Sequence, residues 1–162
     1  MIKRVKATKV GDIFEVKISD TEKKYMQYIA SDISQLNSDV VRCFKKKYKI
    51  EECPLLKEIV SDEVEFYAHC DSRHGIRVNL WVLYGNSQDV GDLKKPLFRD
   101  TNDHGNIISK NWYVWHIGEE FLHVGKLKGE HRNADIGIVA SAKSMYEWVK
   151  CGSYQGVRPR FE

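Results

Sequence analysis

Two histidines and a cysteine lie close together near the middle of the chain, at His69, Cys70 and His74, and side chains of these types bind metal ions. In an extended strand, consecutive side chains point to opposite faces of the sheet, so His69 and Cys70 cannot readily share one ion. The spacings typical of zinc ligands do not occur either. We therefore expect packed or surface side chains here, and no metal site.

A second pair of histidines, His116 and His123, falls in two apolar runs that predict a hairpin. Histidines that face each other across a hairpin can bind a metal ion or titrate together. His131 is near in sequence, but no third ligand is evident. We expect the facing pair to pack beside Trp112 and Val114 and not to ligate a metal.

The sequence contains none of the short motifs that identify common catalytic sites. A cysteine nucleophile needs a histidine base beside it in space, and four cysteines and six histidines make such a pairing easy by chance. The GxSxG elbow, the P-loop and the GxGxxG fingerprint do not occur. Carboxylates that crowd together at Asp62, Glu63 and Glu65, and at Glu119 and Glu120, are expected to be solvated. The residues therefore predict no catalytic group and no cofactor, and they leave the partner-binding residues unknown.

The formal charge is +3, from 26 basic and 23 acidic residues, and the positive excess is local. One basic cluster lies within residues 1–9 and another within 45–49. Either cluster could attract phosphate, which leaves a nucleic-acid-binding module open as an alternative. A solvated tail and a solvated turn are the simpler interpretation. The basic residues are Lys3, Arg4, Lys6 and Lys9 in the first cluster, and Lys45, Lys46, Lys47 and Lys49 in the second.

The length of 162 residues and an apolar fraction of 42% suit one globular domain over 1–162. We expect residues 1–8 to form a mobile tail and 153–162 an extended one. The N-terminal residues lack the apolar region of a signal peptide, and no apolar stretch is long enough to span a bilayer. The sequence therefore predicts a cytoplasmic protein with reduced cysteines, in which Cys43 and Cys70 are small core residues.

Hydrophobic patterning predicts strands in the first third of the chain. Apolar residues alternate over 12–18, and two further apolar runs at 25–30 and 40–44 complete the pattern of an antiparallel meander. A short helix is expected next. Pro54 is well placed for the first turn of a helix, and the apolar residues within 55–59 have helical spacing.

Two hairpins are predicted downstream. In the first, an alternating strand at 64–70 is followed by a turn at 71–75 and a return strand at 76–83. In the second, apolar runs at 112–117 and 121–126 flank a short glycine-containing turn. The first strand of this second hairpin is apolar on both faces, so we expect it to be covered on both sides.

The rest of the pattern predicts a mixed fold. Residues 96–99 are expected to form an edge strand or an extended stretch, and 136–139 a short strand. The last element is a helix with Ser141 as its N-cap and Gly152 as its C-cap. We therefore expect an α+β fold: a curved, mostly antiparallel sheet or partly open barrel, with a short middle helix and a C-terminal helix. The terminal helix has an apolar stripe of Ala142, Met145, Trp148 and Val149.

Tryptophans are the largest packing side chains, and two of the four, Trp81 and Trp115, fall on strand faces that the pattern does not assign to the core. Exposed tryptophans there would suit a protein interface. The alternative is a second small core beneath the terminal helix.

Several short segments, ordered along residues 9–127, make the chain resemble the bacterial immunity protein 26 family. Three resemble the family's opening strands, a fourth resembles its segment of glycine, isoleucine and a basic residue followed by tryptophan and glycine, and two resemble its closing blocks. The segments are Val10–Val16, Tyr25–Ile29, Val41–Phe44, Gly75–Arg77 with Trp81 and Gly85, Pro96–Arg99, and Trp112–His116.

This resemblance implies a non-catalytic inhibitor from polymorphic or contact-dependent toxin systems. Such a protein binds a cognate toxin domain in the cytoplasm of the producing cell and blocks the toxin's active site or a nearby surface. The mildly positive charge of this chain argues against a strongly basic nuclease as that toxin, since opposite charges steer association. Some members of the grouping carry a phosphotriesterase label, so a small hydrolase acting on phosphoesters is a second hypothesis, ahead of the nucleic-acid-binding β-barrel module.

Overall fold

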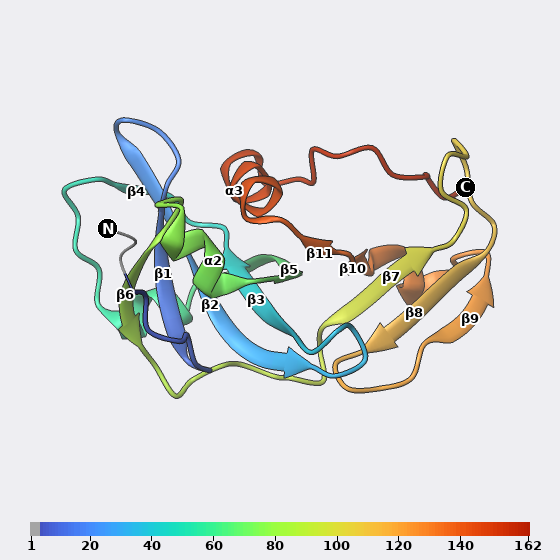
Figure 1. The fold of residues 1–162 in the computed structure, drawn as a ribbon, viewed down its shortest axis with the longest axis horizontal. Helices are drawn as coiled ribbons and strands as arrows, with labels where there is room; N and C mark the ends of the chain where they lie inside the picture. The colour runs from blue at the N-terminus through green and yellow to red at the C-terminus, as the bar shows by residue number, and fades with distance from the viewer. Residues whose placement is uncertain (1–3) are drawn as a thin grey trace.

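The computed structural model describes residues 4–162, and within them the strands form two open β-sheets that lie side by side (Figure 1). Most neighbouring strands run antiparallel, and short α-helices complete the fold. The α+β class is therefore confirmed, together with its middle and C-terminal helices. The strands are divided between two sheets and do not continue into one barrel in this described part of the chain.

The larger sheet has seven strands in residues 4–162, in the order β11-β5-β3-β2-β1-β6, with β4 paired to β2 outside this path. Strands β1, β2 and β3 form the predicted antiparallel meander. β6 pairs with the other side of β1, and β11 joins β5 in parallel. The strands are β1 (Asp12–Lys17), β2 (Glu22–Asp32), β3 (Ser38–Phe44), β4 (Tyr48–Lys49), β5 (Val64–Cys70), β6 (Val82–Asn86) and β11 (Val139–Ala140).

The smaller sheet has four strands in the same described range, in the order β10-β7-β8-β9. The hairpin of β8 and β9 confirms the second predicted hairpin. Residues 96–99 contribute to β7, which lies between β10 and β8 and is not an edge strand. The strand predicted at 136–139 is split at Gly137, because β10 joins the smaller sheet and β11 joins the larger one. The strands are β7 (Leu97–Thr101), β8 (Trp112–His116), β9 (Leu122–Gly125) and β10 (Asp135–Ile136).

Two of the helices lie where the sequence predicts them. Helix α1 (Leu56–Val60) has Leu55 as its N-cap, so Pro54 precedes the helix and does not lie in its first turn as predicted. Helix α3 (Ala142–Cys151) begins after Ser141, whose hydroxyl accepts a hydrogen bond from the Ser144 amide at 3.2 Å. Gly152 ends α3 with a left-handed φ of 74°, which a glycine adopts without strain. The predicted apolar stripe of α3 is buried. A short 3₁₀ helix, η1 (Gly129–Asn133), and helix α2 (Ser72–Arg77) complete the set.

The first predicted hairpin is wrong, because residues 72–77 form α2 and the following strand, β6, pairs with β1 and not with β5. The Asp71 carboxylate caps α2 by accepting the His74 amide at 3.0 Å. The Trp81 indole lies against Gly75 and donates to the Ser72 carbonyl at 2.8 Å. These contacts close the segment into a helical turn, although its alternating apolar residues suggest a strand.

The N-terminal residues lie beside α2. The predicted mobile tail at 1–8 falls in part on residues 1–3, which lie outside the described residues. Within the described part, the Arg73 guanidinium donates to the Val5 carbonyl, with its shorter hydrogen bond at 2.7 Å. The Thr8 and Ser72 hydroxyls are 2.6 Å apart.

Apolar side chains pack on both faces of the larger sheet. The most extensive cluster lies between one face and α3, and a smaller one lies between the other face and α1. Further clusters lie between the two sheets and on the smaller sheet. Cys43 and Cys70 are buried in the cluster beneath α3, as predicted, and burial raises the pKa of both thiols.

All four tryptophans are buried. Trp81 and Trp115 are each only 2% exposed, so the suggestion that they form a surface interface is wrong. Trp81 joins Trp148 in the core beneath α3, which fits the alternative prediction. Trp115 instead packs between the two sheets.

Replacing Gly75 with alanine should destabilise the protein, although alanine is the better helix former. The added Cβ would lie 1.8 Å from Cζ2 of Trp81, so the indole must move away from its hydrogen bond to Ser72. We expect the free energy of unfolding to fall by about 1–3 kcal/mol, measured by urea denaturation. Lys143→Ala, on the exposed side of α3, is the control and should change it by less than about 0.5 kcal/mol. An unchanged or raised stability for Gly75→Ala would contradict the packing of Trp81 on α2.

Candidate functional site

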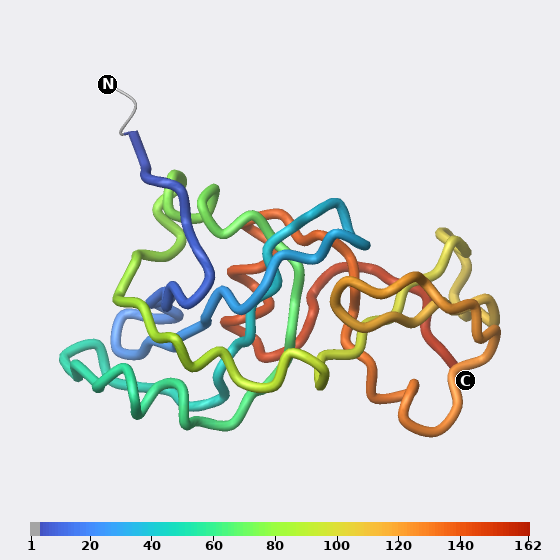
Figure 2. The backbone as a smooth tube through the Cα atoms, turned by 90° about the horizontal axis from the view of Figure 1, so that it is seen from below, coloured from blue at the N-terminus to red at the C-terminus, as the bar shows by residue number. Residues whose placement is uncertain are grey.

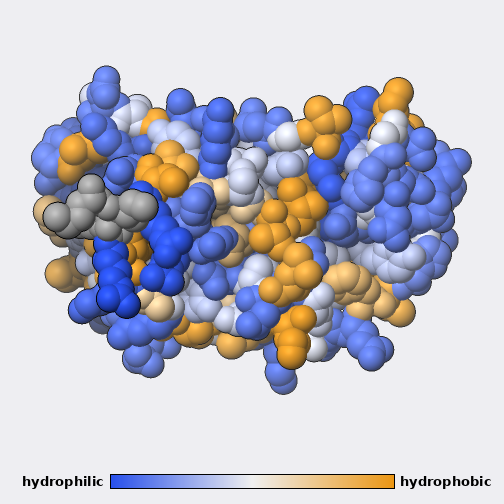
Figure 3. Space-filling view, in the orientation of Figure 1, coloured by the Kyte–Doolittle hydropathy of each residue, from blue (hydrophilic) through white to orange (hydrophobic). Residues whose placement is uncertain are grey.

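An open groove of about 590 Å³ lies between α2 and α3. Apolar side chains dominate its lining, and two of them, Val78 and Val139, are 44% and 38% exposed. Figure 3 shows apolar groups (orange) among polar ones across the middle of the molecule, over β11 and toward the β2–β3 turn. The charged rim of the groove carries both signs. The rim residues are Asp71, His74, Lys143 and Glu147, and the apolar lining includes Val78, Leu80, Val139, Ala140 and Ala142.

The α2 wall of the groove is fixed to the larger sheet by a carboxylate and an indole. Asp39 on β3 accepts the Ser72 amide at 3.0 Å and the Ser72 hydroxyl at 2.5 Å. Trp81 adds its bond to the Ser72 carbonyl. Because all three contacts converge on the first residue of α2, the start of the helix is set by the sheet beneath it.

The α3 wall is fixed by packing and by a buried lysine. Trp148 stacks on Phe66 with ring centroids 4.6 Å apart and an interplanar angle of 6°. Lys24, only 2% exposed, donates to the Val149 carbonyl at 3.1 Å and forms an ion pair with Glu65. A cation at the C-terminal end of a helix also opposes the negative end of its dipole. Glu65 is therefore an ion-pair partner of a buried lysine, which corrects the prediction that it is simply solvated.

A second polar centre lies between the two sheets and is closed to solvent. The Asp32 carboxylate accepts His69 Nε2 at 2.8 Å, the Trp115 indole at 3.1 Å and the Gly118 amide at 2.9 Å. It also accepts the Ser34 amide of its own turn at 3.0 Å. Asp32 and His69 are both 0% exposed, so this pair has a structural position and does not line a surface cleft.

The surroundings set the charge state of this pair. Burial raises the pKa of Asp32, but hydrogen bonds from His69, Gly118 and Trp115 outweigh it, and the pKa of Asp32 lies below its ordinary value. Burial lowers the pKa of His69 despite the opposing bond to Asp32. The hydrogen bond to Asp32 requires an N–H at Nε2 of His69. A charged imidazole would carry a second N–H at Nδ1, and this buried atom has no hydrogen-bond partner within residues 4–162. The geometry therefore favours neutral His69 beside anionic Asp32.

The other histidines do not form the expected pair. Tyr113, and not His116, lies opposite His123 across the β8–β9 hairpin, with ring centroids 4.9 Å apart. His116 lies opposite Leu97 on β7 and donates from Nδ1 to the Pro96 carbonyl at 2.6 Å. The prediction that His116 and His123 face each other is therefore wrong. Among residues 4–162, no group of three or more His, Cys, Asp or Glu side chains is arranged to hold a metal ion.

The outcome for His69 and Cys70 follows from strand geometry. The two side chains point to opposite faces of β5, as predicted, with Cys70 beneath α3 and His69 against Phe98 of the smaller sheet, ring centroids 4.2 Å apart. His74 lies on α2 at the rim of the groove.

The basic cluster at 45–49 is largely exposed. Lys45 pairs with Glu63 at 3.7 Å, and Lys46 lies 4.7 Å from the centroid of the Tyr48 ring.

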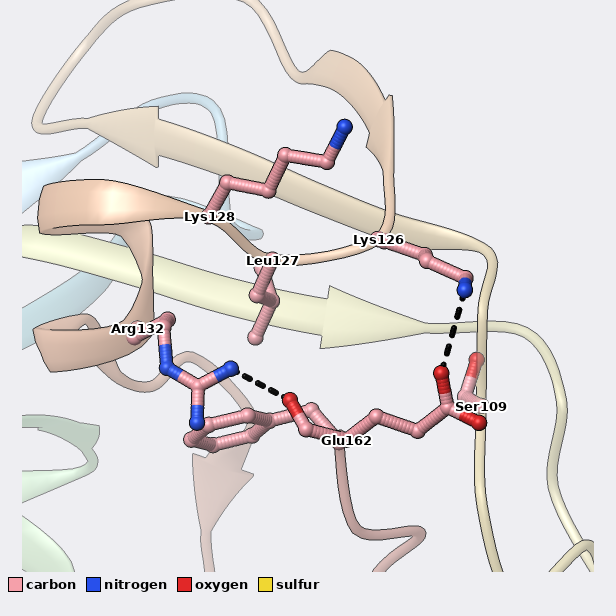
Figure 4. Close-up of a pocket in the computed structure, with 7 residues that line it drawn as sticks. Ser109, Lys126, Leu127, Lys128, Arg132 and Glu162 are labelled. Carbon is pink, nitrogen blue, oxygen red and sulfur yellow. Dashed lines mark hydrogen bonds and ion pairs between the residues drawn. The ribbon is translucent and has the colours of Figure 1, made fainter.

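A smaller concavity, about 210 Å³, lies beside the smaller sheet, and the last residues of the chain form part of its wall (Figure 4). Its polar lining is mainly basic, with Lys126, Lys128 and Arg132 around Phe161 and Glu162. The predicted extended tail at 153–162 thus ends in contact with the smaller sheet, where Ile108 and Arg160 form a parallel bridge.

Sequence reasoning missed Asp32, Lys24 and Phe161. Asp32 and Lys24 lie at either end of an apolar run, where polar residues are ordinarily solvated, and their buried partners are distant in the chain. For Phe161 the sequence offered a signal, because an aromatic side chain in a predicted tail has a large apolar surface to bury against the domain.

The chain matches no family model, no curated protein and no solved structure. Its resemblance to the immunity protein 26 family therefore stays a prediction. No helix in residues 4–162 combines the length and apolar character needed to cross a membrane.

Stability should fall in mild acid because of His69. Burial lowers the pKa of His69 in the folded protein, so the imidazole is protonated in the unfolded chain at a higher pH than in the folded one. The stability that neutral His69 contributes is therefore lost as the pH falls below 6.5, the ordinary pKa of histidine. We expect His69→Gln, which keeps a donor for Asp32, to weaken the decline in unfolding free energy between pH 7 and pH 5. The difference in slope is at most about 1.4 kcal/mol per pH unit.

Urea denaturation of both proteins at pH 7, 6 and 5 measures this slope. Asp135 acts in the opposite direction, since burial raises its pKa to about 6 and its protonation in acid favours the folded state. Its contribution cancels when the variant is compared with the natural protein. Equal pH dependence in the two proteins would show that His69 does not titrate as described.

Proposed function

We propose that this protein binds a cognate bacterial toxin and neutralises it in the cytoplasm of the producing cell. The observation that carries the proposal is the groove between α2 and α3, with its partly exposed apolar lining and its rim of mixed charge. In this proposal an apolar segment of the toxin occupies the groove, and the body of the immunity protein covers the toxin's active site or a neighbouring surface.

The groove has the composition expected of a protein-binding surface. Apolar side chains at the centre of an interface supply most of the favourable burial, and a charged rim supplies orientation and selectivity. Asp71 and Glu147 provide negative charge at the rim, and Lys143 provides positive charge. We therefore expect the bound segment to carry apolar residues flanked by charges of both signs.

The walls of the groove are held before any partner arrives. Asp39 and Trp81 fix α2, while Lys24 and the stacked Trp148 fix α3. A preformed surface loses little conformational entropy on binding, which favours high affinity for a given contact area. Inhibition by occupancy requires such affinity, because the complex must persist for as long as the toxin is present.

One segment of the family resemblance lies behind this groove. Gly75–Arg77 belongs to α2, and Trp81 packs α2 onto the core, but other residues of α2 and its flanks make the lining. The segment therefore supports the α2 wall from within.

Aspartate substitutions in the groove test the proposal. Val78→Asp and Val139→Asp place a charge on the apolar surface, and each should weaken binding to the toxin domain encoded by the neighbouring gene about 10- to 100-fold. The same variants should lose protection of cells that express this toxin domain. Calorimetry or surface plasmon resonance gives the affinity, and colony counts give the protection.

Val157→Asp is the matched control, because Val157 is fully exposed and lies outside the groove. It should bind and protect like the natural protein. Urea denaturation confirms that all three variants remain folded. Folded groove variants that bind the toxin with unchanged affinity would refute the assignment of the groove, and failure of the natural protein to bind or protect would refute the function itself.

A further inference from the structure

The last residues of the chain pair with the loop between β7 and β8, beside the smaller sheet. The Arg160 amide donates to the Ile107 carbonyl at 2.8 Å, and the Ser109 amide donates to the Arg160 carbonyl at 2.9 Å. These paired backbone bonds form the parallel bridge between Ile108 and Arg160. Adding an extended segment to existing backbone in this way is a common mode of peptide recognition.

The side chain of Phe161 occupies a place defined by cations and an indole. The guanidinium carbons of Arg99 and Arg132 each lie 5.0 Å from the centroid of its ring. The Trp112 ring meets it edge-on, with centroids 6.3 Å apart and an interplanar angle of 86°. Guanidinium groups placed around one aromatic ring form favourable cation–π contacts, so the site selects an aromatic side chain.

The carboxylate of Glu162 completes the contact. It lies 3.1 Å from Lys126 Nζ and 3.5 Å from Lys110 Nζ, while Arg132 donates to the Glu162 carbonyl (Figure 4). The nearby lysines, first through the hydrogen bond from Lys126, lower the pKa of Glu162, so it is anionic at neutral pH. The site therefore recognises an aromatic residue followed directly by an acidic one.

The chain that leads to this site has one exposed stretch, followed by an anchor in which Arg158 pairs with Asp100 on β7 and Pro159 is buried. After α3, the tail crosses from the larger sheet to the smaller one (Figures 1 and 2). Residues 155–157 on this path are exposed, and Val157 is fully so. Release of the tail breaks the Arg158–Asp100 ion pair and the bridge at Ile108, and leaves the strand pairing of both sheets unchanged.

We propose that the place filled by Phe161, between Arg99, Arg132 and Trp112, is a binding site for an aromatic–acidic segment of a second polypeptide, and that Phe161–Glu162 occupies it in cis. The partner segment displaces the tail and takes over its contacts with Arg99, Arg132 and Lys126. The tail shows which side chains the site accepts: an aromatic ring between two guanidinium groups and a carboxylate beside a lysine. This site lies on the smaller sheet, away from the groove, and the inference goes beyond the toxin binding assigned there.

A peptide added in trans tests the inference. The probe is a fluorescent peptide with the sequence of residues 156–162, titrated against the full-length protein and against its Phe161→Ala variant. A tethered tail competes at an effective concentration in the millimolar range, so the peptide should bind the variant at least tenfold more tightly than the natural protein. Fluorescence anisotropy measures both affinities.

Two controls define the chemistry. A peptide with the Phe161→Ala change should not bind the variant. Adding Lys126→Glu to the Phe161→Ala protein should weaken binding of the natural peptide and favour a peptide with the Glu162→Lys change. If Phe161→Ala does not fold, as judged by urea denaturation, Glu162→Gln takes its place and should bind the natural peptide more tightly than the unmodified protein does.

Three results would contradict the inference. The inference is overturned if the peptide binds neither protein, or if peptides with and without the aromatic residue bind equally. A concentration-dependent dimer of the natural protein that disappears in Phe161→Ala, detected by light scattering, would assign the pocket to a second copy of this chain and overturn its assignment to a different partner.

Discussion

The buried carboxylate of Asp32 makes the most highly connected polar contact between the two sheets of this protein. It lies at the end of β2 and accepts hydrogen bonds from His69 in the same sheet, from Trp115 on β8 and from Gly118 in the turn that follows β8. Asp135 on β10 adds a second contact by accepting the Tyr67 amide of β5 at 3.1 Å. Because the groups around Asp32 are shielded from water, their donors would be left unsatisfied if its carboxylate were removed while the sheets stayed packed. The apolar cluster between the sheets, which includes Phe98, therefore forms around a fixed polar contact.

The groove and the contacts of Phe161 lie on different sheets. The groove between α2 and α3 is built on the larger sheet, and Phe161 packs against the smaller one. Besides the Asp32 contact, three segments of the chain pass between the sheets: the connection from β6 to β7, the extended chain from β10 to β11, and the tail that leaves α3 (Figure 1). A partner that displaces the tail thus removes one of these links, while Asp39, Trp81 and Lys24 keep the walls of the groove in place.

Hydrophobic periodicity and capping residues were sufficient to predict those elements whose structure depends on their own residues. The meander, the β8–β9 hairpin and α3 with its Ser141 cap follow from periodicity and capping chemistry. Pattern failed at residues 76–83, because Trp81 seals a helical turn onto the core where the apolar alternation suggests a strand. The groove was also beyond prediction, since Val78 and Val139 come together only through the parallel pairing of β11 with β5. A polar residue such as Asp32, at the end of an apolar run, carries no periodic signal that its partners lie in another sheet.

The stability of the Asp32→Ala variant tests the central claim most directly. Removal of this carboxylate leaves the buried donors of His69, Trp115 and Gly118 without an acceptor. The free energy of unfolding should therefore fall by about 3 kcal/mol or more. Asp20→Ala, at an exposed turn, should change it by less than about 0.5 kcal/mol. Urea denaturation of the two variants beside the natural protein gives the comparison. Equal stabilities for Asp32→Ala and Asp20→Ala would contradict the account, because the sheets would then be held together without the buried carboxylate.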